Sequence, residues 1–182
     1  MLYCFLANGF EETEAVAAVD TVRRGGIDVK TVGIGGKLIK GAHGISVVAD
    51  IDGELLGDIS NDITGVILPG GMPGTVNLGK SKIVEKWLDF AVENNLIVAA
   101  ICAAPSILGQ RGMLKGKTAV CFDGFEELLD GATLGDGRTA ADGNIITAIG
   151  AGAAIEFGLE IIAAVKGRGK AEAIGKSMKC KE

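Results

Sequence analysis

The sequence predicts an α/β fold in which a mostly parallel sheet carries helices on both faces, the doubly wound arrangement. Short apolar runs of strand length alternate with segments of helical period from one end of the chain to the other. The runs are apolar throughout rather than at every second residue, which is typical of parallel strands buried on both faces. A length of 182 residues suits one ordinary domain. We therefore expect residues 1–182 to form a single domain.

Seven segments are expected as strands because they are short, apolar and bounded by turn residues. They span residues 2–7, 27–34, 45–49, 63–68, 96–101, 118–121 and 144–149. Five segments are expected as helices because their apolar residues recur three or four positions apart. They span residues 11–24, 82–92, 103–110, 153–165 and 169–179. Pro105 is tolerated because it falls in the first turn of its helix.

The charge and hydropathy of the chain argue against several classes of partner. A formal net charge of −5, with lysines and arginines scattered along the sequence, provides no basic stripe for nucleic acid. The longest apolar run, residues 96–104, is far shorter than the roughly 20 residues that cross a bilayer. Residues 1–7 lack the basic lead-in of a signal peptide and run into an acidic cluster. We expect a cytoplasmic protein without nucleic-acid or membrane partners.

The sequence offers little to hold a metal or a cofactor. The four cysteines show no CxxC spacing and the chain has one histidine, which disfavours zinc and disulfide scaffolds. No GxxxxGK[ST] motif is present, and Gly33, Gly35 and Gly36 lack the spacing of a dinucleotide fingerprint. We expect neither a metal nor a cofactor. The high glycine content, 29 of 182 residues, predicts many tight turns and close backbone approaches.

Three loops that follow expected strands carry the residues of greatest chemical interest. They are residues 8–14, 69–71 and 102–104. In an open parallel sheet, ligands bind beyond the carboxyl ends of the strands, where loops from neighbouring strands meet. If the three strands are neighbours, the three loops form one site.

Cys102 lies where a buried strand turns abruptly into a helix. This position resembles a nucleophile elbow, in which a reactive side chain is held at the tip of a sharp bend, and the alanines around it leave room. A helix that begins just after the cysteine favours the thiolate, so the pKa of Cys102 is predicted to be lowered. The alternative is a buried, inert cysteine that acts as a small hydrophobe.

Glu14 and the pair Gly70–Gly71 are the candidates in the other two loops. Glu14 shares a helix face with core residues, so its carboxyl group should turn toward the sheet and have a raised pKa. Such a group can donate a hydrogen bond to a thiolate or shuttle a proton. Two glycines after a strand can present amide hydrogens to a developing oxyanion. The simpler alternative for the two glycines is an ordinary turn. For Glu14 it is an acidic residue that only complements the helix dipole, as expected for Glu11 and Glu12.

These motifs resemble, in order and spacing, the hallmarks of the ThiJ/PfpI superfamily. The stretches concerned are NGFEETE at residues 8–14, LPGG at 68–71 and AAICAAP at 99–105. They are most similar to the branch of the Parkinson's-disease-associated deglycase. Further similarity at Arg23–Arg24, at residues 142–157 and at Gly167 extends the resemblance over almost the whole chain.

The resemblance implies one ThiJ/PfpI-like domain, a flavodoxin-like α/β sandwich of the class I glutamine amidotransferase type, and a homodimer. It implies Cys102 as nucleophile, Glu14 as its protonated carboxyl partner, and an oxyanion site at the backbone of Gly70, Gly71 and Ala103. Members of this family are cofactor-free enzymes that act on methylglyoxal and glyoxal or remove early glycation adducts from proteins. They are also oxidative-stress sensors whose cysteine forms a sulfinate.

The sequence departs from the family pattern at one position. Many relatives have a histidine in the strand after the elbow helix, and Cys121 stands at the matching place. Without that histidine, peptidase activity is not expected, because amide hydrolysis needs a general acid for a poor leaving group. The one histidine, His43, is expected either to line the partner subunit's pocket or to be an ordinary loop residue.

Two further hypotheses remain open from the sequence. If Cys121 lies near Cys102, it could resolve a sulfenic acid into a disulfide, which would make the pair a redox switch. The protein could also be a stress-induced chaperone that uses its dimer surface. The leading hypothesis is a cofactor-independent glyoxalase or deglycase whose partners are small reactive carbonyl compounds or glycated proteins.

Overall fold

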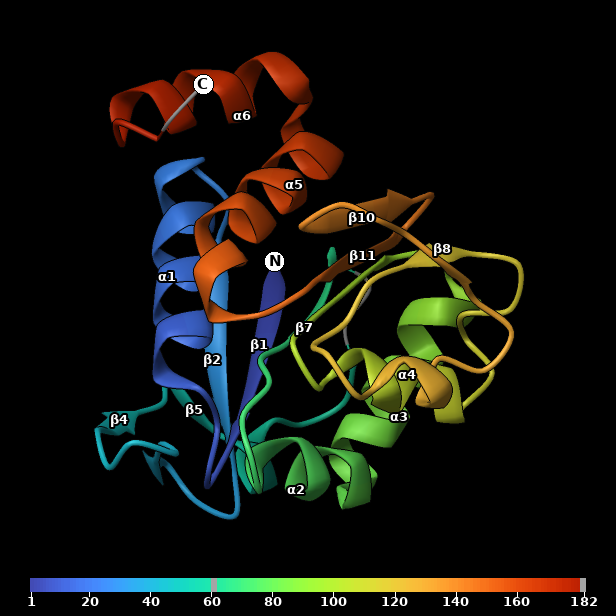
Figure 1. Cartoon of the computed structure of the whole chain (residues 1–182). Coiled ribbons are helices and arrows are strands. Elements are labelled where there is room, and N and C mark those ends of the chain that lie inside the picture. Colours follow the sequence, from blue (N-terminus) through green and yellow to red (C-terminus); the bar gives the residue numbers. More distant parts are fainter. Residues whose placement is uncertain (60–61, 181–182) are drawn as a thin grey trace.

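The computed structural model describes residues 1–59 and 62–180. Its centre is a seven-stranded sheet with the strand order β10-β11-β7-β6-β1-β2-β5 (Figure 1). All neighbours in this sheet are parallel except β10, which pairs antiparallel with β11. The strands are β1 Leu2–Ala7, β2 Val29–Ile34, β5 Ile51–Asp52, β6 Gly65–Leu68, β7 Ile97–Ile101, β10 Thr139–Asp142 and β11 Ile145–Ala148.

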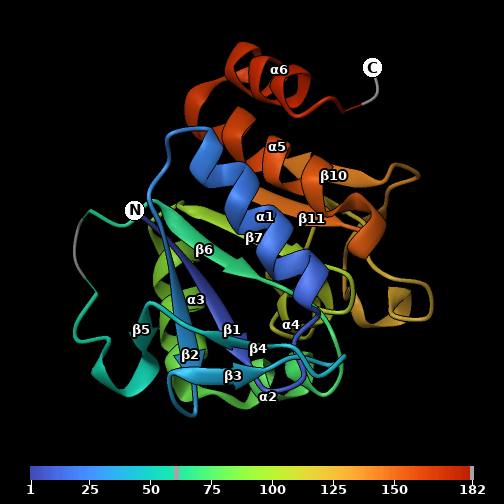
Figure 2. The ribbon, with the colours of Figure 1, turned by 90° about the vertical axis from the view of Figure 1, so that its left-hand side faces the viewer.

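Helices cover both faces of the sheet, which confirms the predicted fold class. On one face lie α1 (Glu12–Arg24) and α5 (Ala154–Lys166), and α6 (Arg168–Ser177) packs on α5. On the other face lie α2 (Gly74–Lys80), α3 (Lys82–Glu93) and α4 (Pro105–Gln110). Figure 2 shows α1 and α5 in front of the sheet and α3 behind it. Three short 3₁₀ helices span Gly53–Leu55, Glu126–Leu128 and Ala151–Ala153.

The hydrophobic core is divided by the sheet into two clusters. One cluster joins the sheet to the apolar faces of α1 and α5 and includes Val22, Phe157 and Ile161. The other joins it to α3 and α4 and includes Trp87 and Leu88. The strands β1, β6 and β7 are buried almost throughout, as expected for central parallel strands.

Two predicted strands lie outside the main sheet. In the segment 45–49, β4 (Ser46–Val48) forms a separate antiparallel hairpin with β3 (Leu38–Lys40), because its Ser46 and Val48 side chains are exposed and offer no core face. In the segment 118–121, β8 (Thr118–Ala119) pairs with β9 (Thr133–Leu134). The edge strands β5 and β10 and the helix α2 were not predicted, because they are short or weakly apolar.

The remaining boundaries follow the sequence closely. The helix predicted over residues 103–110 begins at Pro105, and the helix predicted at the end of the chain is α6. Among the helices of the described ranges, none is long and apolar enough to cross a membrane. That these elements make a single domain stays a prediction.

Gly158 of α5 allows this helix to approach α1 closely. A Cβ atom at this position would lie 2.7 Å from Cβ of the buried Thr21. We expect Gly158→Val to lower the free energy of unfolding by about 2 kcal/mol, since added volume in a packed contact forces the neighbours apart. Urea denaturation monitored by circular dichroism measures this change.

Gly169 provides the matched control in a neighbouring helix. It lies in α6, and nothing lies within 4 Å of a Cβ atom built on it. Gly169→Ala should leave the free energy of unfolding unchanged or raise it by up to about 1 kcal/mol, because alanine has the higher helix propensity. Equal losses in both variants would contradict the close approach of α5 to α1.

Candidate active site

The three loops singled out in the sequence meet at one edge of the sheet. They follow β1, β6 and β7, which are neighbours in the strand order. Backbone hydrogen bonds join them, since the N–H of Glu11 donates to the carbonyl oxygen of Gly70 at 2.9 Å. This is the edge at which open parallel sheets bind ligands.

Cys102 occupies the sharp bend that follows β7. Its φ of 65° is in the left-handed region, which non-glycine residues rarely adopt. The bend is held from both sides, because its N–H donates to Ala148 at 2.8 Å and its carbonyl oxygen accepts from the N–H of Phe122 at 2.9 Å. The side chain is half-buried rather than sealed in the core. The expected elbow is therefore present.

Glu14 reaches the same place from the first turn of α1. Its side chain is 1% exposed, and Oε2 accepts a hydrogen bond from the N–H of Gly70 at 2.8 Å. The carboxyl group also hydrogen-bonds with the Cys102 thiol. Its other oxygen, Oε1, is buried and has no hydrogen-bond partner among the residues that the structure describes. A buried acceptor without a partner is uncommon and points to a role in binding or proton transfer.

The backbone of Gly70, Gly71 and Ala103 surrounds the thiol. A Cβ atom on Gly70 would lie 2.7 Å from Cβ of Cys102 and 2.8 Å from Oε2 of Glu14, so only glycine fits between them. Gly71 has a φ of 89°. The N–H groups of Gly71 and Ala103 donate hydrogen bonds to the sulfur of Cys102. The structure thus brings together five of the residues that the sequence suggested.

The pKa of the Glu14 carboxyl group is raised, as predicted. Burial is the main cause and raises this pKa to about 7, with a smaller contribution from the charge of Glu11. Hydrogen bonds from Cys102 and from the N–H of Gly70 oppose the shift. At neutral pH the carboxyl group is therefore poised between its two protonation states, as suits a group that exchanges protons.

The predicted lowering of the Cys102 pKa is wrong. Burial raises the pKa of the thiol to about 12, and the charge of the neighbouring Glu14 acts in the same direction. The amides of Ala103 and Gly71 lower it only in part. The helix α4 starts at Pro105 and has six residues, so its dipole does not offset the burial. In the resting pair the sulfur keeps its proton and hydrogen-bonds with Glu14.

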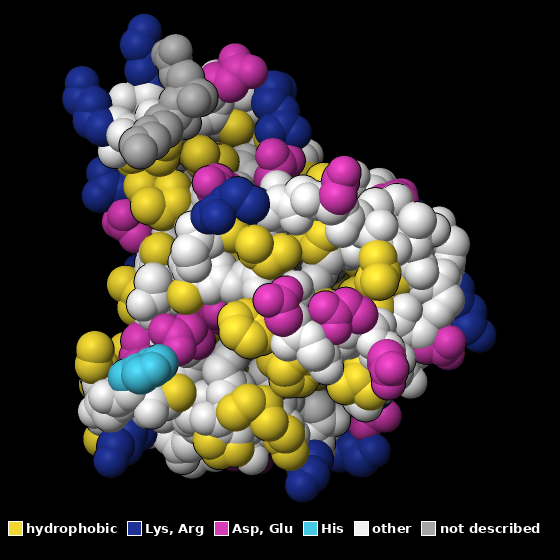
Figure 3. All heavy atoms as spheres, in the orientation of Figure 1, with side chains coloured by type: hydrophobic (Ala, Val, Ile, Leu, Met, Phe, Trp, Pro, Cys, Tyr) yellow, Lys and Arg dark blue, Asp and Glu magenta, His cyan; other side chains and the backbone are white. Residues whose placement is uncertain are grey.

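His43 lies outside this cluster. It is exposed on the loop between β3 and β4, with Nδ1 3.1 Å from Oε2 of Glu12 and 3.2 Å from Oε2 of Glu11. Hydrogen bonding to Glu12, together with the charges of Glu11 and Glu12, raises the pKa of His43. Figure 3 shows the histidine against acidic side chains. A position in a partner subunit's pocket stays a prediction.

Glu12 has a role that the sequence analysis missed. Its side chain is buried, and Oε1 accepts hydrogen bonds from the backbone N–H groups of His43 at 2.9 Å and Ile45 at 3.2 Å. A Cβ atom on Gly41 would overlap the Glu12 carboxyl group, and this close approach is the reason for a glycine there. Glu12 therefore anchors the loop rather than only complementing the helix dipole.

Among the described residues, the acidic side chains around His43 form the one group whose donor atoms are near enough to one another to hold a metal ion. Glu11, Glu12 and His43 offer one ligand atom each, all within 4.8 Å of one another. The Glu12 carboxylate already has two backbone donors and the imidazole as partners, so the cluster is satisfied without an ion. We assign no metal to it.

Cys121 and Cys102 pack on different sides of the sheet. Cys121 is buried in the cluster beneath α3 and α4, whereas Cys102 packs against the cluster beneath α1 and α5. Burial raises the pKa of Cys121 to about 11, with smaller contributions from the charges of Glu126 and Asp123. A redox pair of Cys121 with Cys102 stays a prediction.

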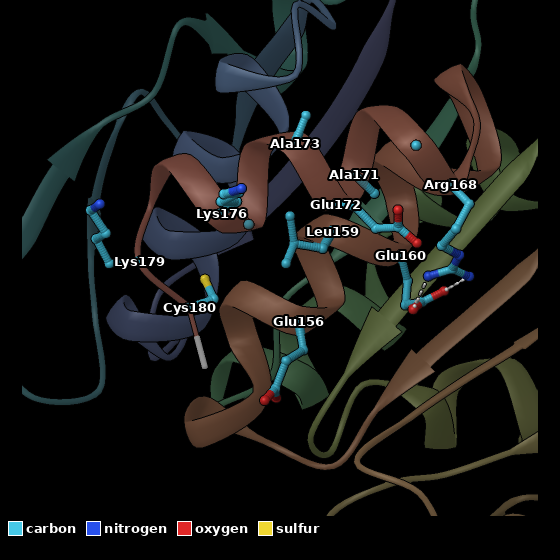
Figure 4. A pocket seen from close by; sticks show the side chains of 12 residues that line it. Glu156, Leu159, Glu160, Arg168, Ala171, Glu172, Ala173, Lys176, Lys179 and Cys180 are labelled. Carbon is cyan, nitrogen blue, oxygen red and sulfur yellow. Dashed lines mark hydrogen bonds and ion pairs between the residues drawn. The ribbon is translucent and has the colours of Figure 1, made fainter. Parts of the chain in front are cut away.

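A separate cavity of about 890 Å³ lies between α5 and α6 (Figure 4). Charged side chains line it, including the ion pair of Glu160 with Arg168, and Leu159 lies on its apolar side. Neither Cys102 nor Glu14 lines this cavity. The candidate site at the sheet edge is therefore distinct from this cavity.

The fold and this edge define an α/β protein with a cysteine on a strained bend beside a buried carboxyl group. The model of the DJ-1/PfpI family matches residues 2–164. The chain belongs to the DJ-1/PfpI family, which confirms the resemblance seen in the sequence.

Relatives and solved structures agree with this assignment. Protein DJ-1 homolog B of Arabidopsis thaliana is 38% identical over 170 residues, which cover 91% of this chain and 38% of that protein, so the chain spans well under half of that relative. Glutathione-independent glyoxalase DJR-1.2 of Caenorhabditis elegans is 28% identical over 170 residues, covering 92% and 89% of the two chains. The structure of oxidized Toxoplasma gondii DJ-1 matches with a TM-score of 0.93 at 28% identity, covering 100% and 98%.

The raised pKa of Glu14 makes folding stability depend on pH. A carboxyl group whose pKa is about 7 when folded and near 4.5 when unfolded stabilises the fold below pH 4.5, and this contribution is lost as the pH rises through 7. When the pH is raised from 5 to 8, the free energy of unfolding of the wild type should fall by on the order of 2 kcal/mol more than that of Glu14→Gln. Urea denaturation at both pH values measures the difference.

The surface glutamate Glu93, at the end of α3, provides the control. Glu93→Gln should show the same dependence of stability on pH as the wild type, because an exposed carboxyl group gains little from the fold. If Glu14→Gln also follows the wild type, the carboxyl group of Glu14 does not have a raised pKa in the folded protein.

Proposed function

We propose that this protein is a cofactor-independent glyoxalase that converts 2-oxoaldehydes such as methylglyoxal and glyoxal into 2-hydroxy acids. Cys102 is the nucleophile and Glu14 the proton shuttle. The observation that carries the proposal is the carboxyl group of Glu14, which is fixed by the N–H of Gly70 and hydrogen-bonds with the thiol. It has a pKa of about 7 and one oxygen without a partner among the described residues. The name of the related glyoxalase of Caenorhabditis elegans supports the same reaction class.

The first step joins the substrate to the sulfur. The thiol of Cys102 adds to the aldehyde carbon, and its proton passes to the carboxylate of Glu14, which already hydrogen-bonds with it. A thiol whose pKa is raised needs this base at the moment of attack. The aldehyde oxygen becomes an oxyanion that the N–H groups of Gly71 and Ala103 stabilise, and Glu14 returns the thiol proton to it to give a hemithioacetal.

The second step moves hydrogen within the substrate. The carboxylate of Glu14 removes the proton from C1, the electron pair forms an enediolate, and Glu14 returns that proton to C2 while the proton of the C1 hydroxyl passes to the C2 oxygen. This leaves the thioester of a 2-hydroxy acid, which water hydrolyses to release the acid and restore the thiol. C1 is oxidised by two electrons and C2 is reduced by two, so the reaction needs no external oxidant or cofactor.

The free oxygen of Glu14 suits it to the second step. Oε2 is held by the N–H of Gly70, so the carboxyl group cannot turn away, while Oε1 has no partner among the residues described. A proton transferred between two adjacent carbons requires a single base that stays in place between them. We assign the transfer to Oε1.

Removal of early glycation adducts from proteins belongs to the same proposal. In these adducts an amine of the protein is bound to the former aldehyde carbon, next to a carbonyl group. The thiol of Cys102 replaces this amine, which leaves with the thiol proton passed on by Glu14, and the same hemithioacetal is formed. Without a histidine near Cys102 in the part of the chain that the structure describes, hydrolysis of peptide bonds is not proposed.

A homodimer is the assembly that we propose for this enzyme. Val16 of α1, together with Ile45 and Val48 of the hairpin, are exposed apolar side chains. Val16 and Val48 line the same shallow hollow along α1. Such side chains favour a protein partner, and a second copy that covers them would bring its own surface near the loop of His43. We place the dimer in the cytoplasm.

Oxidation of Cys102 is a second function favoured by one observation. The N–H groups of Gly71 and Ala103 already point at the sulfur and would hold the oxygens of a sulfinate. Two molecules of peroxide supply these two oxygens and leave two molecules of water. The packing of Cys121 on the other side of the sheet argues against a disulfide as the end product.

Proton NMR of methylglyoxal tests the enzymatic proposal. The wild type should form lactate, Cys102→Ala should form none above buffer, and Glu14→Gln should be slower by about 10²-fold to 10⁴-fold. The wild-type kcat/KM should rise with pH through about 7, as Glu14 ionises, and this inflection should be absent in Glu14→Gln.

Cys180 provides the control for the loss of a thiol. It is half-buried near the end of the chain, beside α6 and away from the site. Cys180→Ala should keep the wild-type rate. Absence of lactate above buffer from the wild type would remove the enzymatic proposal.

Mass spectrometry of the intact protein after mild peroxide treatment tests the second function. We expect a gain of two oxygen atoms that disappears in Cys102→Ser and persists in Cys121→Ser. A loss of two hydrogens that disappears in Cys121→Ser would instead show a disulfide between the two cysteines and contradict the separation of their side chains.

A further inference from the structure

Phe122 is a half-exposed aromatic residue joined directly to the bend of Cys102. Its side chain is 50% exposed, which is unusual for phenylalanine. Its backbone N–H donates to the carbonyl oxygen of Cys102 at 2.9 Å, so the position of Phe122 is fixed relative to the nucleophile. Neither the sequence motifs nor the proposed mechanism gives this residue a role.

The ring of Phe122 borders the space beside Gly150. A Cβ atom built on Gly150 would lie 3.2 Å from Cδ2 of Phe122 and 3.9 Å from Oε1 of Glu14. The aromatic ring and the free oxygen of the proton shuttle therefore lie near the same side of Gly150. Because residue 150 is glycine, it has no side chain to separate them.

A 2-oxoaldehyde bound to Cys102 has to direct its substituent past this side of Gly150. C1 is bound to the sulfur of Cys102, and C2 must be within reach of Oε1 of Glu14 when the proton is transferred. The group attached to C2 then extends past Oε1 toward Gly150 and the ring of Phe122. An apolar or aromatic substituent gains contact area against that ring.

The charges near Phe122 disfavour an anionic substituent. The carboxylates of Asp123 and Glu126 lie close enough to raise the pKa of Cys121, the residue before Phe122. Arg138 reaches the loop after β11, but its guanidinium group pairs with Glu156 at 2.9 Å and donates to the carbonyl oxygen of Gly152. The one cation among these contacts, Arg138, is therefore already paired and does not favour an anionic substituent.

We propose that Phe122 determines substrate specificity, and that the site prefers neutral 2-oxoaldehydes with an aromatic or bulky apolar substituent. This inference rests on the proposed glyoxalase function and names its substrate class. Phe122 binds the substituent and takes no part in proton transfer. Phenylglyoxal, which would give mandelate, is the probe that matches the ring most directly.

The ratio of kcat/KM for phenylglyoxal to kcat/KM for methylglyoxal tests the proposal. Proton NMR of mandelate and lactate measures both reactions. Phe122→Ala should lower the ratio about tenfold, chiefly through a higher KM for phenylglyoxal, because the lost contact is with the substituent and not with the reacting carbons. Phe122→Leu, which keeps apolar surface and preserves the fold most closely, should give an intermediate ratio.

Leu134 is the matched control. It is an exposed apolar residue in β9, 55% exposed, and Leu134→Ala should keep the wild-type ratio. An unchanged ratio in both Phe122 variants, with lactate still formed, would overturn the specificity proposal and leave the glyoxalase function standing. A wild type that forms neither lactate nor mandelate would overturn both.

Discussion

The hydrogen bond from the N–H of Gly70 to Oε2 of Glu14, 2.8 Å long, is the contact on which the candidate site depends. It joins the first turn of α1 to the loop after β6, and both lie against the bend of Cys102. A carboxyl group this deeply buried is costly unless it is hydrogen-bonded. The bond limits that cost on one oxygen and leaves the other oxygen free for chemistry.

Two opposing effects act on the sulfur of Cys102, and their balance decides how it reacts. Backbone amides favour the thiolate, whereas burial and the neighbouring carboxylate favour the thiol, and the second pair is stronger. The thiolate therefore forms together with proton transfer to Glu14 rather than waiting in the resting protein. A site of this kind keeps its nucleophile protected until a substrate replaces water beside it.

The sequence predicted the fold and the meeting of the three loops because local patterns determine both. Buried apolar runs identified β1, β6 and β7, and the abrupt change after residue 101 identified the bend. The direction of the Cys102 pKa was not predictable, because it depends on burial and on a carboxylate that only the folded chain brings near. Phe122 was missed for a related reason: its ring lies next to Gly150, which is 28 positions away in the sequence, and only the folded chain brings the two together.

Glu12 and Glu14 leave the same turn of α1 in different directions. Glu12 holds the loop between β3 and β4, and Glu14 holds the loop after β6. Because one helical turn carries both residues, a displacement of the β3–β4 hairpin would pull on Glu12 and thereby move the carboxyl group of Glu14 relative to the thiol. A molecule that docks on the hairpin would thus alter the alignment of the reactive pair without touching it.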